Sequence, residues 1–346
     1  MKSTLDELLG RINILDIISQ YVKLRKTGRN YVGLCPFHKE KTPSFSVSIE
    51  KQIYYCFGCH EGGNAINFLM KYENISFHEA LENLAQQYGV EIKRGNPKRA
   101  NSFDALMKLS EFYHNGLKNF RFALKYLSER GIDEKTIDEF KLGYSEKTRN
   151  GIRDFLKSTG IPVDILLGTG IVRIKDNEVY DIFRGRLVIP IFDVNRKVIG
   201  FGGRTLEKDG IPKYINSPES PVFSKGLSLF GIDKTRKHIA EKNEAIIVEG
   251  YFDFISLYMC GIKNVVATLG TSVTEEQLSK LRNYTENITL MLDGDEAGIK
   301  SALRLIGTLS EMDINGSMVV LPEGNDPDSF VRKEGIDGVS RVIETK

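Results

Sequence analysis

The feature that most constrains this 346-residue chain lies in its last third, where three apolar runs are each followed by carboxylates. The runs occupy residues 245–248, 288–292 and 318–321, and each is close to a glycine. Short runs of this kind predict buried strands of a parallel sheet. The carboxyl ends of such strands border the ligand crevice of an open α/β sheet. We therefore expect one sheet edge to gather six acidic side chains: Glu249, Asp253, Asp293, Asp295, Asp326 and Asp328.

Carboxylates gathered at one edge repel one another unless cations lie between them. Hard divalent ions with oxygen ligands, Mg²⁺ above all, meet this need and suit phosphate chemistry. The alternative is that each acid caps the helix that follows its strand. A single Asp-x-Asp favours the cap, but three such strand ends within about 80 residues favour an acidic site for Mg²⁺ or Mn²⁺.

The composition is that of an ordinary globular protein, with 41% hydrophobic and 27% charged residues and no apolar run of transmembrane length. The N-terminus has no signal-peptide core, so we expect a cytoplasmic protein without membrane contacts, and a monomer. A formal net charge of +2 means that any nucleic-acid binding must come from local basic clusters.

Two ligand pairs in the first hundred residues predict a zinc site. Cys35 and His38 are three positions apart, as are Cys56 and Cys59, and seventeen residues separate the pairs. This is the spacing of a tetrahedral Cys₃His zinc ribbon on two hairpin turns. His60 is the competing ligand, but His38 completes the spaced pair. Four protein ligands leave no open position, so one structural zinc per chain is expected.

Two basic clusters are candidates for nucleic-acid contacts. The first flanks the ribbon and suits single-stranded DNA, because cations track phosphates and rings stack on bases; a solvated basic face is the alternative. Its residues are Lys23, Arg25, Lys26, Arg29 and Tyr31. The second cluster lies among glycines, which would let backbone amides approach an anion while the cations supply charge. The alternative is that these glycines and arginines form tight hairpins. The second cluster comprises Arg184, Arg186, Arg204, Lys213 and Lys225.

Taken in order, these motifs resemble those of bacterial DnaG-type DNA primases over nearly all of the chain. The ribbon resembles the CHC2 zinc-binding domain, and residues 184–226 resemble the basic motifs of the RNA polymerase domain. The Toprim signatures are matched at residues 248–253, 269–272, 293–298 and 326–328. Two departures are His60 and Asn64, where the family usually has Gly and Asp.

The resemblance implies an α/β multidomain protein: an N-terminal zinc ribbon, then an α+β basic subdomain joined to a Toprim-type parallel sheet. The expected divisions are a ribbon domain at 1–93, a linker at 94–102, a basic subdomain at 103–235, a Toprim subdomain at 236–330 and the start of a C-terminal helical subdomain at 331–346. We expect this chain to lack the family's C-terminal helicase-binding domain, which puts direct docking of the replicative helicase in doubt.

The resemblance also implies a replication enzyme: a nucleotidyltransferase that makes short RNA primers on single-stranded DNA from ribonucleoside triphosphates, without a primer. Glu249, Asp293 and Asp295 would act at the reacting centre, with divalent metal held there and by Asp253, Asp326 and Asp328. Glu249 would position or deprotonate the attacking hydroxyl, or bind metal. The contacts to nucleotide or template would come from Arg130, Arg184, Arg186, Arg204, Lys213 and Lys225.

Rival functions remain open at this point. The Toprim fold also occurs in topoisomerases and nucleases, but a topoisomerase needs a further domain and a nuclease needs neither the ribbon nor the basic block. A non-catalytic template-binding protein would be marked by degraded carboxylates. All six are present, which favours the enzyme.

Overall fold

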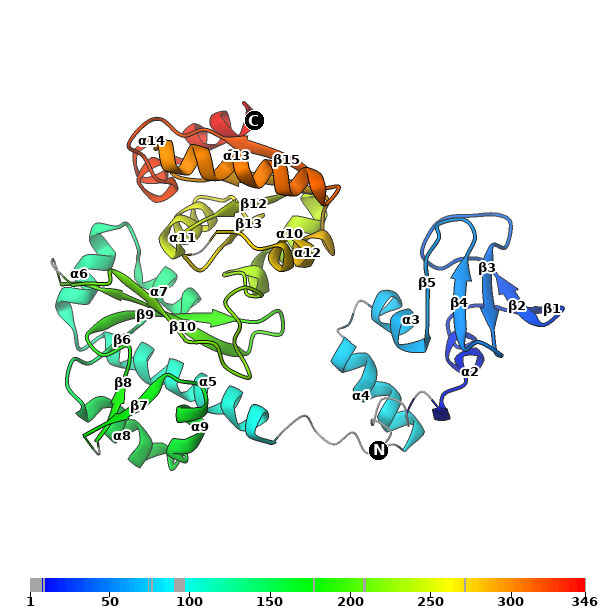
Figure 1. Ribbon diagram of the computed structural model, residues 1–346, viewed down its shortest axis with the longest axis horizontal. Helices are drawn as coiled ribbons and strands as arrows, with labels where there is room; N and C mark the ends of the chain where they lie inside the picture. The colour runs from blue at the N-terminus through cyan, green and yellow to red at the C-terminus, as the bar shows by residue number, and fades with distance from the viewer. Residues whose placement is uncertain are drawn as a thin grey trace. The chain divides into compact units, whose positions relative to one another are not determined.

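The computed structural model describes residues 8, 10–73, 75, 77–89, 97–176, 178–207, 210–270 and 272–345. The chain forms two compact units, Met1–Pro97 and Lys98–Lys346 (Figure 1). In the described part of the chain, no helix is both long and apolar enough to cross a membrane.

The first unit is built on a five-stranded antiparallel sheet in the order β1-β2-β3-β4-β5, as the sequence predicts. Burial alternates along β3 and β4, so that Phe45, Val47, Tyr54 and Cys56 face the core, as expected for a sheet with one buried face. The strands are β1 (Arg25–Thr27), β2 (Asn30–Gly33), β3 (Phe45–Ser48), β4 (Ile53–Cys56) and β5 (Gly62–Gly63).

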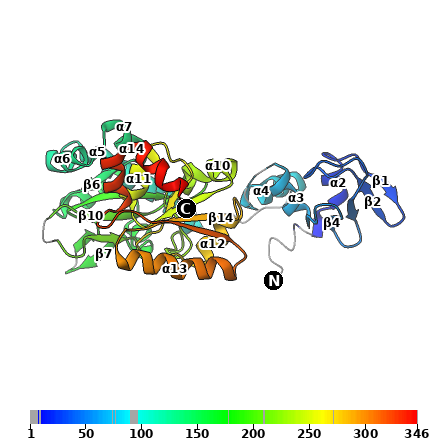
Figure 2. The same ribbon diagram turned by 90° about the horizontal axis from the view of Figure 1, so that it is seen from above.

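The described part of the first unit also contains the helices α2 (Ile14–Ile18), α3 (Ala65–Tyr72) and α4 (Phe77–Tyr88) (Figure 2). Phe68 of α3 packs on the stacked rings of Phe45 and Tyr54. Asn64, one of the two departures from the primase pattern, caps α3: its side chain accepts a hydrogen bond from Asn67 N at 3.0 Å. An amide caps a helix about as well as a carboxylate, so this substitution is structurally neutral.

Helix α5 (Pro97–Leu117) begins inside the predicted linker 94–102. Residues 97–102 are therefore helical, and residues 94–96 lie outside the described residues. The prediction gave too much weight to proline as a helix breaker, because proline is compatible with the first turn of a helix, where its missing N–H has no partner to lose.

The second unit contains three sheets. An antiparallel sheet has the order β11-β10-β9-β6, β7 pairs with β8, and a parallel sheet has the order β13-β12-β14-β15. The strands are β6 (Gly143–Ser145), β7 (Val172–Lys175), β8 (Glu178–Asp181), β9 (Arg186–Phe192), β10 (Val198–Thr205), β11 (Tyr214–Asn216), β12 (Ala245–Val248), β13 (Val265–Ala267), β14 (Asn287–Met291) and β15 (Asn315–Val319).

Helices cover both faces of the parallel sheet. Ile246 and Val248 of β12 face the core shared with α11 and α14, whereas Ala245 and Ile247 face α10, α12 and α13. The helices are α10 (Ile232–Lys242), α11 (Tyr251–Met259), α12 (Glu275–Arg282), α13 (Glu296–Glu311) and α14 (Pro327–Glu344). The predicted third buried strand is only partly correct, since β15 is an edge strand that is half exposed and ends at Val319.

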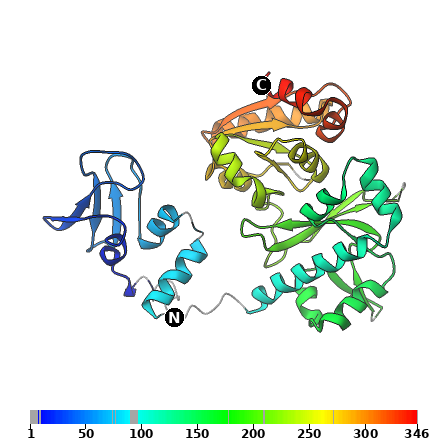
Figure 3. The same cartoon turned by 180° about the vertical axis from the view of Figure 1, so that it is seen from behind.

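The antiparallel and parallel sheets share one core. Leu187, Ile189 and Ile191 of β9 pack in the same cluster as β12 and α11. The remaining helices of this unit are α6 (Arg121–Glu129), α7 (Glu134–Phe140), α8 (Asn150–Thr159) and α9 (Val163–Gly168). Val339 and Ile343 of α14, drawn in red in Figure 3, belong to this core too, so the predicted division at 330/331 falls inside a helix that is broken only locally at Gly335.

Candidate metal centres and their arginine partners

The parallel sheet brings its acidic strand ends together, as expected. Glu249 directly follows β12, and Asp293 follows β14 by two residues. The loop after β15 then crosses the loop after β14, where Gly294 N donates to Asn325 O at 2.9 Å. A Cβ atom on Gly294 would lie 2.6 Å from Leu321 O, so only glycine permits this crossing. The close approach of the two loops places Asp326 beside Asp293.

Several of these carboxylates also cap helices. Asp295 Oδ1 accepts from Gly298 N at 2.7 Å, and Asp326 Oδ1 accepts from Ser329 N at 2.6 Å. Capping, the alternative that the sequence left open, therefore applies to both residues. Each cap occupies one carboxylate oxygen, so capping does not exclude a second role for the other oxygen.

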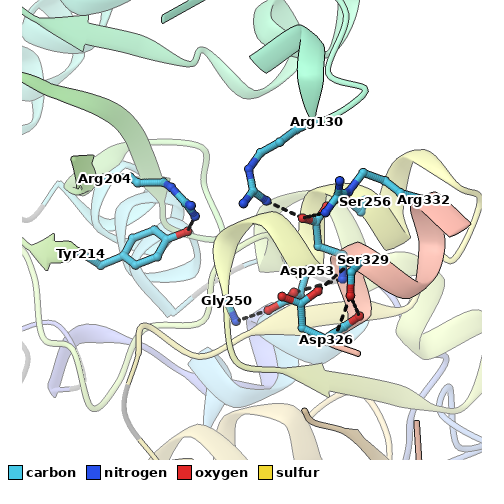
Figure 4. A network of polar contacts seen from close by, with 10 residues as sticks. Arg130, Arg204, Tyr214, Gly250, Asp253, Ser256, Asp326, Ser329 and Arg332 are labelled. Carbon is cyan, nitrogen blue, oxygen red and sulfur yellow. Dashed lines mark hydrogen bonds and ion pairs between the residues drawn. The ribbon is translucent and has the colours of Figure 1, made fainter. Parts of the chain in front are cut away.

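Asp253, on the first turn of α11, is held by two backbone amides. Gly250 N donates to Oδ2 at 3.0 Å and Asp328 N donates to Oδ1 at 3.2 Å (Figure 4). Burial, followed by the charge of Asp326, raises the pKa of Asp253 to about 7. The carboxyl is thus fixed in place but is easier to protonate than an ordinary aspartate.

Mutual repulsion is the common electrostatic property of this edge. Burial, then Asp293 and Asp295, raises the pKa of Glu249. Burial also raises the pKa of Asp293, assisted by Asp326 and Asp295 and opposed by Lys213. A divalent cation between these oxygens would relieve the repulsion, and carboxylates are the ligands that Mg²⁺ and Mn²⁺ prefer.

Asp326 is the exception among them. Burial acts to raise its pKa, but hydrogen bonds from Ser329 and the positive charges of Arg130 and Arg332 outweigh burial, so the pKa is lowered. Asp326 is therefore held in its charged form more firmly than an ordinary aspartate.

Asp328 differs from the other acids because its carboxylate is almost fully buried and both oxygens are used. Ser256 Oγ donates to Oδ1 at 2.5 Å, while Oδ2 accepts from Arg130 and from Arg332 Nη2, the latter at 3.2 Å (Figure 4). The side chain is 3% exposed. The structure thus gives this predicted metal ligand two arginine partners.

Two of the predicted basic residues share an aromatic cage. The Arg130 guanidinium lies 5.2 Å from the ring of Tyr126 and 4.8 Å from that of Phe252. Arg204 lies 5.1 Å and 5.3 Å from the same two rings and donates to the hydroxyl of Tyr214. Arg204 is 9% exposed, and its Nε has no hydrogen-bond partner among the described residues. Rings on several sides hold both cations rigidly.

The other predicted cations have different surroundings. Lys213 is exposed, and its positive charge partly opposes the rise in the pKa of Asp293. Arg186 Nη1 donates to Pro212 O at 2.9 Å, and the Arg184 guanidinium stacks on Tyr180 at 5.2 Å. Lys225 lies beside α12, where its carbonyl accepts from Gln277. Among these cations, the contacts in the described part of the chain link Arg130 and Lys213 to carboxylates of the acidic edge, whereas Arg204 shares the aromatic cage of Arg130.

Two glycines of the basic block, Gly202 and Gly203, serve packing, so the prediction that they admit an anion is wrong for these two. Gly202 and Gly203 lie in the buried strand β10. A Cβ atom on Gly202 would lie 2.4 Å from the ring of Tyr251, and one on Gly203 would lie 2.5 Å from that of Phe183. Large rings press against the strand from both sides and leave no room for a side chain.

In the first unit, the four predicted zinc ligands form one group. The ligand atoms of Cys35, His38, Cys56 and Cys59 all lie within 4.8 Å of one another. The Sγ atoms of Cys35 and Cys59 are 3.8 Å apart, which equals the edge of about 3.8 Å expected for a tetrahedron with zinc–sulfur bonds of about 2.3 Å. The residues fit a structural zinc. His60 lies outside the group, and its Nδ1 is instead 3.0 Å from the hydroxyl of Tyr55.

Sequence analysis missed several residues around both centres. Tyr126, Tyr214 and Phe252 form the cage around the arginines; Tyr214 and Phe252 lie within recognised motifs but were given no role. Glu40 and Ser44 contact the zinc ligands, as described below. No spacing rule could have found them, because their roles come from contacts between separate elements.

Three family models match consecutive parts of the chain. They describe a CHC2 zinc finger at residues 1–100, the N-terminal domain of the DNA primase catalytic core at 112–236 and a Toprim-like domain at 246–331. DNA primase of Aquifex aeolicus is 42% identical, with 100% of this chain and 69% of the relative covered. The chain belongs to the DNA primase family. DNA primase of Clostridium acetobutylicum is 44% identical over 96% of this chain, yet only 57% of that relative is covered, so this chain is shorter than the primases it matches.

Solved primase structures have the same fold. The zinc-binding and RNA polymerase domains of Aquifex aeolicus primase match with a TM-score of 0.68 and 42% identity, covering 100% of this chain and 86% of the other. A DnaG primase catalytic domain bound to single-stranded DNA matches with a TM-score of 0.65 and 34% identity, covering 72% and 79%. These matches agree with the predicted fold class.

The ribbon of this primase-family chain exposes part of the surface predicted to bind DNA. Lys23, Arg25, Lys26 and Arg29 are exposed on and around β1 and β2, and Tyr31 is half-buried. The neighbouring aromatic residues differ in exposure: Tyr54 is in the core, while Phe57 is 70% exposed. The ring of Phe57 packs edge-on against Tyr55, 5.1 Å away, so a pair of aromatic rings lies beside the zinc ligands.

Proposed function

We propose that this chain synthesises short RNA primers on single-stranded DNA by metal-dependent nucleotidyl transfer. The observation that carries the proposal is the meeting, within one unit, of mutually repelling carboxylates and caged arginines. Asp293 and Asp326 supply negative charge for cations, and Arg130 and Arg204 supply fixed positive charge for phosphates. The family to which the chain belongs supports this reading over other Toprim chemistry.

In the proposed reaction, the 3′-hydroxyl of one ribonucleotide attacks the α-phosphate of the next, and pyrophosphate leaves. Divalent metal at this edge would neutralise charge on the triphosphate. Asp293 and Asp295 would hold it, with Asp326 adjacent. Arg204 is suited to a phosphate oxygen, because its Nε has no hydrogen-bond partner among the described residues and the surrounding rings fix the guanidinium in advance.

Glu249 is suited to act on the attacking hydroxyl. It directly follows β12, and its raised pKa makes it a better proton acceptor than an ordinary glutamate. Lys213, exposed beside Asp293, would offset the charge of the leaving pyrophosphate.

Asp253 and Asp328 are assigned supporting roles. Asp253 uses both oxygens on backbone amides and would join the metal site through remaining lone pairs. Asp328 is paired with Arg130, so in this proposal it positions that arginine as well as adding negative charge.

The ribbon would contribute template binding. Its exposed cations would track the DNA phosphates, and Phe57 and Tyr55 would stack on bases. Single-stranded DNA bound to a related catalytic domain supports this class of partner. Separately, Arg184 and Arg186, near the start of β9, would contact template phosphates on the second unit.

The test is incorporation of labelled ribonucleotides on single-stranded DNA without a primer, with Mg²⁺ or Mn²⁺. The wild type should make short RNA, and Asp293→Ala should abolish synthesis while retaining the wild-type circular dichroism spectrum. Glu311→Ala is the matched control, because Glu311 is an exposed carboxylate at the opposite end of α13 from the acidic edge; its activity should be unchanged.

Two outcomes would refute the proposal. RNA synthesis retained by Asp293→Ala would remove the metal site from this edge. No product from a folded, zinc-loaded wild type would favour the rival function, a template-binding protein without turnover; binding of labelled single-stranded DNA by the same sample would then identify it.

A further inference from the structure

A carboxylate that is not a predicted zinc ligand, Glu40, contacts two of the four zinc ligands and is linked to a third through Ser44. Glu40 Oε1 accepts hydrogen bonds from the backbone amides of Cys35, at 2.7 Å, and of Ser44, at 3.1 Å. Glu40 Oε2 lies 2.5 Å from Ser44 Oγ and 3.2 Å from His38 Nε2. Ser44 Oγ is in turn 3.1 Å from Cys56 Sγ. The Glu40 side chain is only 11% exposed, so these are its main surroundings.

The orientation of the His38 ring identifies which nitrogen faces the metal site. Nδ1 is 3.8 Å from Cys56 Sγ, the same separation as that between the sulfurs of Cys35 and Cys59. Nε2 points to Glu40 Oε2 instead. A carboxylate only accepts, so Nε2 must carry the proton, which leaves the lone pair of Nδ1 free for zinc.

Gly58 also restricts the His38 ring. Gly58 lies between the two cysteines of the second ligand pair, and a Cβ atom there would be 2.7 Å from His38 Nε2 and 3.0 Å from Ser44 Oγ. Gly58 is therefore required by space, because the imidazole packs directly on its backbone. Glu40 and Gly58 together leave the ring little freedom to rotate.

We propose that Glu40 is a positioning residue of the zinc site, which fixes the tautomer and orientation of His38 and thereby prolongs zinc retention. A carboxylate that accepts the second N–H of a ligating histidine raises the basicity of the ligand and fixes its angle. Ser44 connects the same carboxylate to Cys56. This role concerns metal retention and does not depend on RNA synthesis.

The competing explanation is that Glu40 only closes its loop by accepting the amides of Cys35 and Ser44. Glu40→Gln separates the two, because the glutamine Oε1 still accepts both amides whereas its amide nitrogen cannot accept the His38 proton. A loop-closing role predicts little change in this variant. A positioning role predicts faster zinc loss.

The experiment measures zinc release from the intact chain to an excess of a chromogenic chelator. Glu40→Gln should release zinc about 10- to 100-fold faster than the wild type, the range known for partners of metal-ligating histidines. Glu61→Gln is the matched control, since Glu61 lies in the same ribbon but its carboxylate pairs with Lys71; its release rate should equal that of the wild type. An unchanged rate in Glu40→Gln would overturn the proposal.

A second measurement needs no variant and so stands even if Glu40→Gln fails to fold. In the zinc-loaded wild type, nitrogen-15 NMR of histidine rings should show His38 with Nδ1 bound to metal and Nε2 protonated. A third measurement does use the variants: in Co²⁺-substituted protein, the visible absorption bands should shift between wild type and Glu40→Gln and not between wild type and Glu61→Gln. Metal on Nε2, with a proton on Nδ1, would refute the proposed geometry.

Discussion

The two candidate metal centres differ in how closely their ligand atoms are gathered and in how strongly those ligands repel one another. In the ribbon, four ligand atoms lie within 4.8 Å of one another, and Glu40 and Ser44 support them from behind. At the acidic edge, no group of described carboxylates meets that criterion, and burial together with neighbouring charge raises the pKa of three of them. The first site would be closed by protein ligands, whereas the proposed second site would leave ligand positions for substrate.

This difference is the physical distinction between a metal that folds a module and one that serves a reaction. A closed tetrahedral set gains stability from metal binding and offers no vacant position. An open carboxylate set costs stability without metal, because like charges are held close together, and the cost is recovered when cations and phosphates arrive. The two sites should therefore respond in opposite directions when one of their ligands is removed.

The largest effect on stability is expected from loss of zinc. Cys56→Ser should abolish the unfolding transition of the first unit, since zinc contributes on the order of 10 kcal/mol to small zinc modules. The second unit, with its own cores, should keep its transition in calorimetry. Cys260→Ser is the control, because Cys260 ends α11 far from any zinc ligand in the sequence. If Cys56→Ser folded and retained one zinc per chain, the ribbon would not need its closed set of four ligands, which would contradict the contrast between the two sites.

The next largest effect should come from Arg130. Arg130→Ala leaves the buried Asp328 carboxylate with only Ser256 and the more exposed Arg332, and should lower the free energy of unfolding of the second unit by about 2–3 kcal/mol. Arg332→Ala should cost less than about 1 kcal/mol, because its guanidinium is 41% exposed.

A double variant tests whether Arg130 stabilises the fold by neutralising the charge of Asp328. Asp328→Asn in the Arg130→Ala background should recover part of the loss, because it removes the uncompensated charge. Urea unfolding measures all three variants. An Arg332→Ala effect equal to that of Arg130→Ala would contradict the pairing described here.

A smaller, pH-dependent effect is expected from Asp253. Its pKa is about 7 in the folded protein against an ordinary value of 3.8, so the folded state holds this proton more tightly than the unfolded state does. The associated stability is fully present below about pH 4 and is lost as the pH rises through about 7. In metal-free protein we expect a decrease of about 2 kcal/mol between pH 5 and pH 7.

Asp326→Asn tests the cause of that pH dependence. Asp326 stays ionised above pH 5 in both folded and unfolded states, so its own titration adds nothing in this window. Its removal should lower the pKa of Asp253 and flatten the stability curve, while carboxyl carbon-13 NMR follows the Asp253 titration directly. An unchanged curve would mean that the charge of Asp326 does not raise this pKa.

The smallest change in stability, and the one of opposite sign to zinc loss, is expected from Asp293→Asn. Without metal, it should stabilise the second unit by less than about 1 kcal/mol, because repulsion from Asp326 and Asp295 is relieved on a half-exposed group. RNA synthesis should nevertheless fall by at least about 100-fold. Melting in EDTA and in Mg²⁺ measures the effect, with Glu311→Gln as control. Destabilisation in EDTA would show that the edge is not repulsive.

The sequence by itself determined what depends on local spacing. The zinc ligands Cys35, His38, Cys56 and Cys59 follow from two short turns, and alternating burial in β3 and β4 follows from the period of a strand. The acidic edge was predictable too, since parallel strands place their carboxyl ends together. Family resemblance extended these inferences to the order of the domains.

Only the tertiary structure decided how these residues are paired. Arg130 and Asp328 are 198 positions apart, and their ion pair depends on how α6 and α14 pack around α11. The same packing turns Gly202 from an expected anion contact into a space for the ring of Tyr251. Spacing along the chain constrains neighbours within a few residues, whereas the partner of a buried charge is set by long-range packing, which no local pattern in a single sequence records.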